Sequence, residues 1–364
     1  MNKLEEARKI INETDKEMAS LFVKRMEAAK LVSEYKAERG LPILDQSREN
    51  EVIAKNSVFV EDETLRSYYV SFLKETMGIS RKYQQMLQEG LNVAYSGVEG
   101  AFANIAAKNI FPTAKQIPFG DFTSAYEAVE NGECECAVLP LENSYAGEVD
   151  QVLDIMFQGS LHINGIYDLE VTHNLLGLPG ATINDIKTVI SHPQALEQCA
   201  HFIKKHNFTA VRANNTAISA QNVVEGGDKS VAAIASRDTA KLYGLDILEK
   251  HINESNHNTT RFAVFSRTES IPSPKEDDLR FIMVFTVRNE AGALAEAINI
   301  IGDCGFNMRS IRSRPMKDLM WKYYFYVEAD GNPYSEKGKQ MMNDLSEYCE
   351  HLRIIGSFPH EKKI

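Results

Sequence analysis

The N-terminal stretch constrains the fold most strongly, because neither glycine nor proline occurs between Asn2 and Arg39. Apolar side chains recur through this stretch at helical spacing, namely Leu4, Ala7, Ile11, Met18, Leu21, Phe22 and Val32. We predict a single helix of about 55 Å, ended by Gly40 and Pro42. A small monomeric domain cannot cover a rod of that length, so a partner chain or a coiled-coil arrangement is expected.

Two further helices complete a purely helical first region, residues 1–90. Asp45 has the position and chemistry of an N-cap for a helix from about Gln46 to Asn56. A third helical pattern extends from about Asp62 to Gln88. We therefore predict an all-α domain at the start of the chain.

Length and charge limit the classes of protein that remain. A chain of 364 residues suggests two or three domains, and its net charge of −11 argues against non-specific binding of nucleic acid. No apolar run is long enough to cross a membrane, and the charged N-terminus does not resemble a signal peptide. The five cysteines are too few for a disulfide framework and fit the reducing cytoplasm, where we expect the protein to be located. The "CEC" at 134–136 is interpreted as structural, so no metal site is expected.

Short apolar runs alternate with helical patterns between residues 91 and 267. The runs read as strands are "LNVAYSG", "ECAVLPLEN", "KTVISH", "SVAAIAS" and "RFAVFSR". The stretches read as helices are "AFANIAAKNIF", "TSAYEAVENG" and "PQALEQCAHFIKKH". This alternation predicts an α/β domain with a largely parallel sheet, long enough for two lobes and a cleft between them.

A polar segment with two prolines, residues 268–278, is expected to link this region to a last compact domain, residues 279–358. There the order is strand "LRFIMVFTVRN", helix "GALAEAINIIGDCG", strands "MRSIRSRP" and "KYYFYVEAD", helix "GKQMMNDLSEYCEHL" and strand "RIIGSF". This βαββαβ order predicts a ferredoxin-like α+β domain. The whole chain is therefore expected to be multidomain.

Cations occupy informative positions on the first helix. Arg25 and Lys36 are eleven residues apart and lie within about 20° of each other around the helix. Arg8 lies about 100° away from Arg25, so it suits the pocket of a second chain better than the same pocket. On the third predicted helix, Ser80 and Gln84 share a face. Each residue alone is more often solvated surface than part of a site.

Four motifs of the helical region together resemble the all-helical chorismate mutase domain: "LEEARKII", "VKRMEAAKLVSEYK", "LPILDQSRENEV" and "GISRKYQQ". The resemblance implies that Arg25 and Arg8 of the partner subunit hold the two carboxylates of chorismate. It implies that Lys36 and Gln84 donate to the ether oxygen and that Glu49 accepts from the ring hydroxyl. Asp45, Arg48 and Ser80 would complete the pocket. A Claisen rearrangement requires a held conformer and donors to a developing negative charge, which these residue types supply.

Four motifs of the middle region stand at junctions of predicted strands and helices: "YSGVEGAFA", "VLPLENSYAGEV", "VTHNLLGL" and "VISHPQALEQC". In the first, Gly97 and Gly100 precede a helix, where backbone N–H groups can face an anion. Each motif also has a purely structural interpretation, as a turn, a helix cap or a hydrogen-bonded core histidine.

Followed by "TTRFAVF", these motifs resemble prephenate dehydratase. The resemblance implies that Thr260 is the essential hydroxyl and Arg261 its companion, with Glu142 as a candidate proton donor. It also places Asn143, His173, Ser191 and Gln194 in or near the site. Loss of CO₂ and hydroxide from prephenate is driven by aromatisation, so the enzyme mainly assists the leaving hydroxyl. Neither reaction requires a cofactor or a metal.

The last region resembles a phenylalanine-binding ACT regulatory domain through "NEAGALAEAINII" and "IRSRP". The resemblance implies an effector turn at Gly292, Ala293 and Leu294, together with Ser313, Arg314 and Pro315. The family usually has glutamate before "SRP", whereas this chain has Arg312.

We therefore expect a bifunctional enzyme of phenylalanine biosynthesis that converts chorismate to prephenate and prephenate to phenylpyruvate. It would be regulated by L-phenylalanine and form a homodimer or a higher even-numbered oligomer, without nucleic acid or membrane partners. Alternatives are a monofunctional prephenate or arogenate dehydratase with a dimerising helical domain, or a non-catalytic amino-acid sensor.

Overall fold

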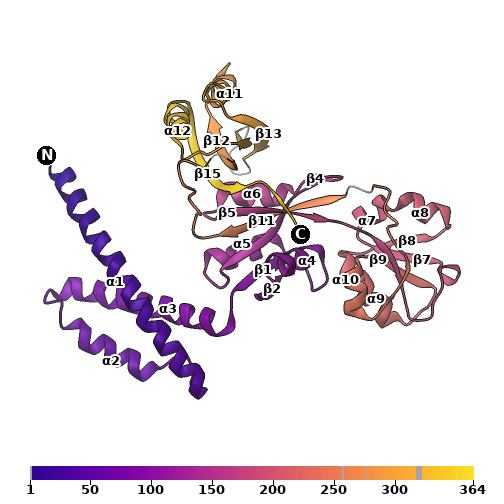
Figure 1. Cartoon of the computed structure of the whole chain (residues 1–364), viewed down its shortest axis with the longest axis horizontal. Helices are drawn as coiled ribbons and strands as arrows, with labels where there is room; N and C mark the ends of the chain where they lie inside the picture. Colours follow the sequence, from indigo (N-terminus) through magenta and orange to yellow (C-terminus); the bar gives the residue numbers. More distant parts are fainter. Residues whose placement is uncertain (1, 256–257, 277, 317–321) are drawn as a thin grey trace. The chain divides into compact units, whose positions relative to one another are not determined.

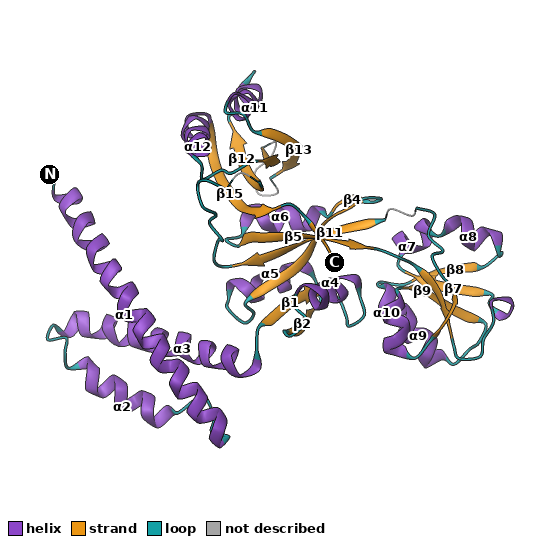
Figure 2. Ribbon diagram, in the orientation of Figure 1, coloured by secondary structure: helices purple, strands orange, loops and turns teal. Residues whose placement is uncertain are grey.

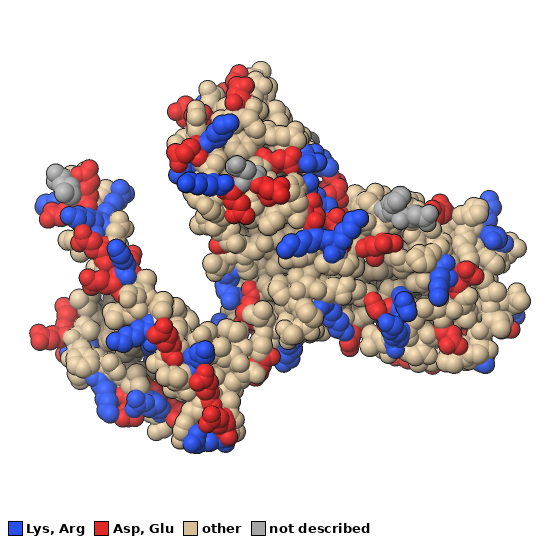
Figure 3. All heavy atoms as spheres, viewed as in Figure 1, with Lys and Arg blue, Asp and Glu red and all other residues tan. Residues whose placement is uncertain are grey.

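The computed structural model describes residues 2–255, 258–276, 278–316 and 322–364. The chain divides into two compact units, Met1–Leu91 and Asn92–Ile364. Within the described residues no helix combines the length and the apolar character needed to cross a bilayer. On the face shown in Figure 3, basic and acidic side chains are intermingled in each unit, without an extended basic patch.

The first unit is helical, as predicted, with α1 Lys3–Arg39, α2 Gln46–Ser57 and α3 Glu63–Glu89 (Figure 1). Gly40 ends α1 in the left-handed conformation, at φ 60°. Asp45 caps α2 by accepting a hydrogen bond from the backbone N–H of Arg48 at 3.0 Å. The sequence therefore identified these three helices and the cap correctly.

The helical unit buries few side chains. Its buried apolar residues among those described are Ala29 and Met77, while on α1 Ile10 remains 59% exposed and Leu21 65% exposed. Polar contacts tie α1 to α3, since Ser33 Oγ donates to the backbone oxygen of Gln84 at 3.2 Å. A row of exposed apolar side chains on a helix of this length is what the expected partner chain would cover.

The second unit contains two sheets of mixed direction (Figure 2). The first has the order β16-β5-β11-β3-β1-β2, with β4 paired to β3. Its strands are β1 Asn92–Ser96, β2 Lys115–Phe119, β3 Cys136–Asn143, β4 Gly147–Glu148, β5 His162–Glu170, β11 Thr259–Ser266 and β16 Lys362–Lys363. The second has the order β10-β6-β9-β7-β8. Its strands are β6 Asn174–Gly177, β7 Thr188–Ser191, β8 Thr209–Arg212, β9 Val231–Ala235 and β10 Asp246–Glu249.

The prediction of a largely parallel sheet was wrong. Strand β1 is parallel to β2 and β3, but β11 is antiparallel to both β3 and β5. In the second sheet β6 is antiparallel to β9 and β10. The physical reason is that the chain enters the second sheet after β5 and returns through β11, which inserts between β3 and β5 and opposes both.

The helices of these two sheets largely follow the sequence pattern: α4 Phe102–Ile110, α5 Phe122–Glu130, α6 Asp150–Gln158, α7 Pro193–Gln198, α8 Ala200–Lys205, α9 Thr216–Gly226 and α10 Arg237–Tyr243, with a short 3₁₀ turn at Ile183–Asp185. The helix predicted over 193–206 is interrupted at Cys199, whose ψ is 15°. Glu254 supplies an acceptor to the start of α8, taking the N–H of His201 at 2.8 Å.

A third, antiparallel sheet has the order β13-β14-β12-β15. Its elements follow the predicted βαββαβ order: β12 Leu279–Val287, α11 Ala293–Asp303, β13 Asn307–Pro315, β14 Tyr323–Asp330, α12 Glu336–Tyr348 and β15 Cys349–Pro359. The last predicted helix is too long at its end, because Cys349 and Leu352 pair with β12 as strand residues.

The third sheet shares a core with the first. Ile282, Tyr326 and Phe358 belong to the same buried cluster as Leu139 and Ile163. The approach of β15 to β5 is so close that a Cβ on Gly356 would lie 2.0 Å from the backbone oxygen of Ile163. The chain then ends in β16, which adds to the edge of the first sheet beside β5.

Candidate active sites

A pocket of about 260 Å³ lies among the three helices of the first unit. Seven of the predicted mutase residues line it: Arg25 and Lys36 from α1, Asp45 at the start of α2, Arg48 and Glu49 from α2, and Ser80 and Gln84 from α3. The structure therefore brings together residues that are up to 59 positions apart in the sequence. Arg81 also lines the pocket but was not predicted as a site residue. Its position within the motif "GISRKYQQ" could have identified it.

The charges of this pocket suit a dianion. Six charged side chains line it, four cationic and two acidic: Arg25, Lys36, Arg48, Arg81, Asp45 and Glu49. The formal excess of two positive charges contrasts with the net charge of −11 of the chain. Two carboxylates are therefore favoured here, and guanidinium groups match them by forked donation.

Internal contacts hold several of these side chains in place. Arg25 Nη1 donates to Ser80 Oγ and, at 3.3 Å, to the backbone oxygen of Thr76. Burial lowers the pKa of Arg25 from its ordinary value. Glu49 forms an ion pair with Arg81, and the described contacts include no bond from Glu49 to Gln84. Gln84 Oε1 is buried without a hydrogen-bond partner in the described part of the chain, so the amide remains free to turn toward a ligand.

Arg8 does not reach this pocket. It is seventeen residues from Arg25 on the same helix, about 25 Å along the axis. Arg8 is exposed and lies beside Glu5 and Asn12 instead. This placement agrees with the expectation that Arg8 serves a pocket other than that of its own chain.

A larger cleft, about 1020 Å³, lies between the first and second sheets. Four predicted dehydratase residues line it: Asn143 at the end of β3, His173 just before β6, Gln194 on α7 and Thr260 on β11. Gly97, at φ 102°, and the residues that begin α4 and α9 also line it. Helix N-termini of this kind favour anionic groups of a ligand.

Backbone donors fix the orientation of the Asn143 amide. Its Oδ1 accepts hydrogen bonds from the N–H groups of Tyr145 and Ala146, both at 3.0 Å. Its Nδ2 must therefore donate, and it lies 2.9 Å from Thr260 Oγ1 and 2.8 Å from Asn258 Oδ1. Since Thr260 Oγ1 is the acceptor in this bond, its own hydrogen is available to a ligand in the cleft.

The neighbours of His173 fix its tautomer in the same way. Asn258 Nδ2 donates to Gln198 Oε1 at 2.9 Å, so that oxygen is an acceptor. His173 Nε2, also 2.9 Å from Gln198 Oε1, then carries the ring hydrogen. Its Nδ1 is buried without a partner among the described residues. Burial lowers the pKa of His173 to about 4, so the ring is neutral near pH 7.

Gln198 and Asn258 were not singled out from the sequence. Gln198 lies one helical turn after Gln194 in "VISHPQALEQC", and Asn258 directly precedes "TTRF". Both residues lie next to residues of the predicted motifs, and this position could have identified them. Their role in orienting His173 and Thr260 depends on contacts between residues 25 to 117 positions apart, which spacing does not reveal.

The described residues that line the cleft do not include Glu142, Ser191 or Arg261. Ser191 is fully buried, and its Oγ donates to the backbone oxygen of Ile234 at 2.6 Å. Arg261 follows Thr260 on β11, and successive side chains of a strand point to opposite faces. Its guanidinium is bound by Glu142 at 3.2 Å, Glu328 at 2.8 Å and Glu361 at 2.7 Å.

Arg261 is therefore a link between the first and third sheets in this structure. Burial by itself lowers the pKa of Arg261, but the carboxylates of Glu328 and Glu361 raise it more, and the pKa lies above its ordinary value. The prediction that Arg261 contacts the substrate is not supported by this geometry. The physical reason is strand alternation, which places Thr260 and Arg261 on different faces of the sheet.

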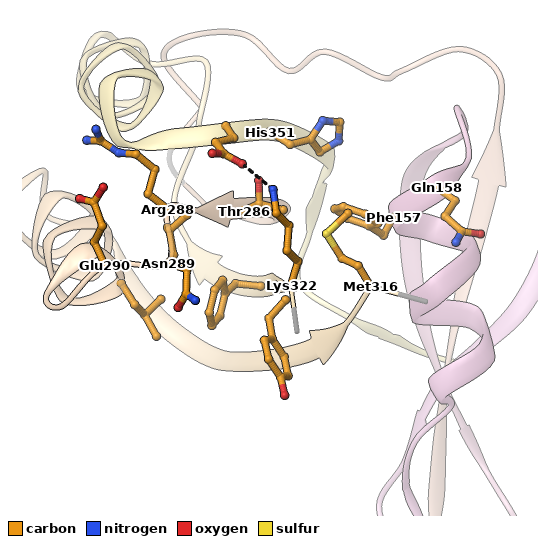
Figure 4. A pocket seen from close by; sticks show the side chains of 14 residues that line it. Phe157, Gln158, Thr286, Arg288, Asn289, Glu290, Met316, Lys322 and His351 are labelled. Atoms are coloured by element: carbon orange, nitrogen blue, oxygen red, sulfur yellow. Dashed lines mark ion pairs between the residues drawn. The ribbon is translucent and has the colours of Figure 1, made fainter. Parts of the chain in front are cut away.

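A third pocket, about 550 Å³, lies between α6 and the C-terminal sheet. Phe157 and Gln158 come from α6, whereas Arg288, Lys322 and His351 come from the C-terminal region (Figure 4). Of the predicted effector residues, Leu294 lines this pocket. Gly292, Ala293, Ser313, Arg314 and Pro315 are not among its described lining residues. Arg314 instead binds Asp154 on α6, with Nε 2.7 Å from Oδ1.

No group of three or more His, Cys, Asp or Glu side chains suited to a metal occurs in the described ranges.

Comparisons with known proteins identify the family of each of the two regions that contain these pockets. Residues 93–270 match the family model described as prephenate dehydratase, and residues 7–85 match the one described as chorismate mutase type II. An arogenate dehydratase/prephenate dehydratase 2 of Arabidopsis thaliana is 31% identical over 88% of this chain and 87% of its own length. A bifunctional chorismate mutase/prephenate dehydratase of Aquifex aeolicus is 29% identical over 99% of this chain and 98% of its own length.

A solved structure extends the likeness to the fold. The prephenate dehydratase of Arthrobacter aurescens, in complex with L-Phe, is 28% identical with a TM-score of 0.70. The match covers 74% of this chain and 90% of that one.

Proposed function

This chain belongs to the bifunctional chorismate mutase/prephenate dehydratase family, and from that premise we propose which residues carry each reaction. It is an enzyme with two activities, the rearrangement of chorismate to prephenate and the decarboxylating dehydration of prephenate to phenylpyruvate. We propose the domain division 1–90 for the mutase, 91–267 for the dehydratase and 279–358 for an ACT regulatory domain. A purely dimerising helical domain and a non-catalytic sensor are both disfavoured, since residues 7–85 match a mutase family.

In the mutase pocket, chorismate is held by cations at both carboxylates. Arg25 binds one of them and Arg8 of the partner subunit binds the other. Lys36 and Gln84 donate to the ether oxygen as the C–O bond breaks, and this interaction lowers the barrier because negative charge grows on that oxygen. Asp45, Arg48, Glu49 and Ser80 complete the wall, with Glu49 accepting from the ring hydroxyl. The side chains supply orientation and charge, and no proton transfer is needed.

The same assignment requires a homodimer or a larger even-numbered assembly. The exposed apolar face of α1 and the distance of Arg8 from its own pocket support it. A partner would cover this face and add the missing cation at the same time.

In the dehydratase cleft, the hydroxyl of Thr260 donates to the leaving hydroxyl of prephenate. The observation that carries this proposal is the bond from Asn143 Nδ2 to Thr260 Oγ1 at 2.9 Å, which directs the threonine hydrogen away from Asn143. As the carboxylate leaves as CO₂, its bonding electrons enter the ring and the hydroxide departs with hydrogen-bond assistance. Asn143, His173 and Gln194 shape the cleft around it. Glu142 is ion-paired to Arg261 outside the cleft, so we do not assign the proton to it.

Product analysis tests this assignment. Thr260→Val keeps the size of the side chain and removes the hydroxyl, and we expect a loss of dehydratase turnover of about 10²-fold or more. Supplied with chorismate, the variant should accumulate prephenate, because the mutase pocket is intact. Thr259→Val is the matched control, one residue away on the same strand and outside the described cleft wall. Formation of phenylpyruvate by Thr260→Val at the wild-type rate would contradict the assignment.

We also propose that L-phenylalanine regulates the dehydratase through the C-terminal domain. The pocket that includes Leu294 supports this, as does the bound L-Phe of the Arthrobacter aurescens structure. The test compares phenylpyruvate formation with L-phenylalanine, with L-tyrosine and without either. Since the plant relative is also named for arogenate, prephenate and arogenate should be compared as substrates in the same assay.

A further inference from the structure

Two arginines of the C-terminal sheet form ion pairs with acidic residues that line the dehydratase cleft. Arg312 on β13 forms an ion pair through its Nε with Glu148 Oε1 on β4. Arg314, two residues further along β13, lies with Nη1 2.5 Å from Asp150 Oδ1 at the start of α6. Glu148 and Asp150 both line the cleft. A segment of the cleft wall is therefore held by side chains that come from outside the dehydratase region.

The geometry of β13 explains why these two residues act together. Positions 312 and 314 alternate with 313, so both side chains leave the same face of the strand. Arg314 is the more buried anchor, with 18% of its side chain exposed, and it also holds Asp154 at 2.7 Å. Tyr324 donates to the same carboxylate at 2.9 Å. Asp154 therefore ties α6 to β13 through Arg314 and to β14 through Tyr324.

The described side chains that line the cleft supply little positive charge. Among its described lining residues there is no lysine or arginine, and the acidic ones are Glu148 and Asp150. Glu148 is the cross-strand partner of Glu142, so its carboxylate lies on the face of β4 that is turned toward β13, at the edge of the cleft. Its two histidines, His173 and His192, both have pKa values lowered by burial. A substrate with two carboxylates would meet like charge at this rim if Glu148 and Asp150 were unpaired. Arg312 pairs with Glu148, and Arg314 is shared between Asp150 and Asp154.

We propose that Arg312 and Arg314 are positioning residues of the dehydratase site, which neutralise Glu148 and Asp150 and hold the rim so that a dicarboxylate substrate can bind. The C-terminal domain thereby contributes to the catalytic cleft directly, in the absence of any effector. The inference rests on the proposed placement of the dehydratase site in the Thr260 cleft.

The test uses the full-length enzyme with prephenate as substrate. Arg312→Ala should raise KM about tenfold and change kcat little, because the unpaired Glu148 repels the substrate at the rim. The increase should shrink as salt is added, since a partly exposed charge is screened within about 8 Å at physiological ionic strength. Arg309→Ala is the matched control: Arg309 is on the same strand and pairs with Asp330 at 2.9 Å, away from the cleft. It should leave KM unchanged.

A second variant separates charge from packing. Arg312→Ala combined with Glu148→Gln removes both charges, and KM should return to within about twofold of the wild-type value. A double variant with the KM of Arg312→Ala, or an Arg312→Ala KM equal to that of Arg309→Ala, would overturn the inference. Chorismate mutase activity in the same samples reports on intact protein.

The Thr260→Val assay keeps the two proposals apart. If Thr260→Val is inactive while Arg312→Ala binds prephenate normally, the role of Arg312 alone is refuted. If Thr260→Val remains active, the placement of the site fails, and the inference about its rim fails with it.

Discussion

Mutase activity should depend on Arg8, although Arg8 lies far from the pocket of its own chain. Seventeen residues of α1 separate it from Arg25, or about 25 Å along the helix. An arginine side chain cannot span that distance, so under the proposed assignment each pocket takes this residue from another subunit. Arg8→Ala and Arg25→Ala each remove one charge-assisted contact to a carboxylate. Such a contact contributes about 1.5–3 kcal/mol, so kcat/KM for chorismate should fall roughly 10- to 150-fold in either variant.

Mixing the two variants gives a sharper result. When the two chains are co-expressed in equal amounts, half of the dimers should carry one chain of each kind. In such a dimer one pocket lacks both arginines and the other has both. The mixture should therefore regain about a quarter of wild-type mutase activity, well above either parent.

The assay follows the loss of chorismate, with dehydratase activity on prephenate as the internal control. Lys9→Ala is a matched control, because Lys9 is a neighbouring exposed cation that pairs with Glu13 at 4.0 Å. A mixture no more active than its parents would refute the argument, as would full activity of Arg8→Ala alone.

Three further predictions concern stability and reactivity. Burial lowers the pKa of His173 to about 4, so the folded protein favours the neutral ring. The resulting contribution to the free energy of unfolding is complete above pH 6.5 and is lost as the pH falls toward 4. Urea titrations should show about 2 kcal/mol less stability at pH 5 than at pH 8 from this residue, and His173→Asn should lack that part of the slope. Gly356→Ala should lower the melting temperature sharply, since the added Cβ would lie 2.0 Å from the backbone oxygen of Ile163. The control Gly302→Ala, whose Cβ would have no atom within 4 Å, should leave the melting temperature unchanged or raise it slightly. Equal melting temperatures of the two variants would contradict this prediction. Burial raises the pKa of Cys136 to about 12, so a thiol reagent at pH 8 should label it only after denaturation, and rapid labelling of the native protein would show that this strand opens.

Local patterns in the sequence determined much of the fold. The absence of glycine and proline from Asn2 to Arg39 fixed α1, and Asp45 and Asp62 marked the starts of α2 and α3. The βαββαβ order of the last region could also be predicted, because the apolar residues of each helix and strand there recur at the spacing typical of that element. These features depend on neighbours within a few residues.

Strand direction could not be read in this way. The apolar run of β11 looks the same whether it lies parallel or antiparallel to β3. Its direction was decided by the return of the chain from the second sheet, which is a long-range property. The end of α12 was likewise decided by the pairing of Cys349 with Val287.

The sites divide along the same line. Side chains one helical turn apart, such as Ser80 and Gln84, could be grouped from periodicity, and motif resemblance singled out Thr260 as a candidate. Strand alternation separates Thr260 from Arg261 and is a local property of the strand. Only the tertiary structure paired Glu142 with Arg261 and gave Arg312 a partner 164 residues away in Glu148. Spacing in the sequence shows which residues share a face of one helix or strand. Charge pairing depends on which helices and strands meet, and the packing of the whole unit determines those contacts.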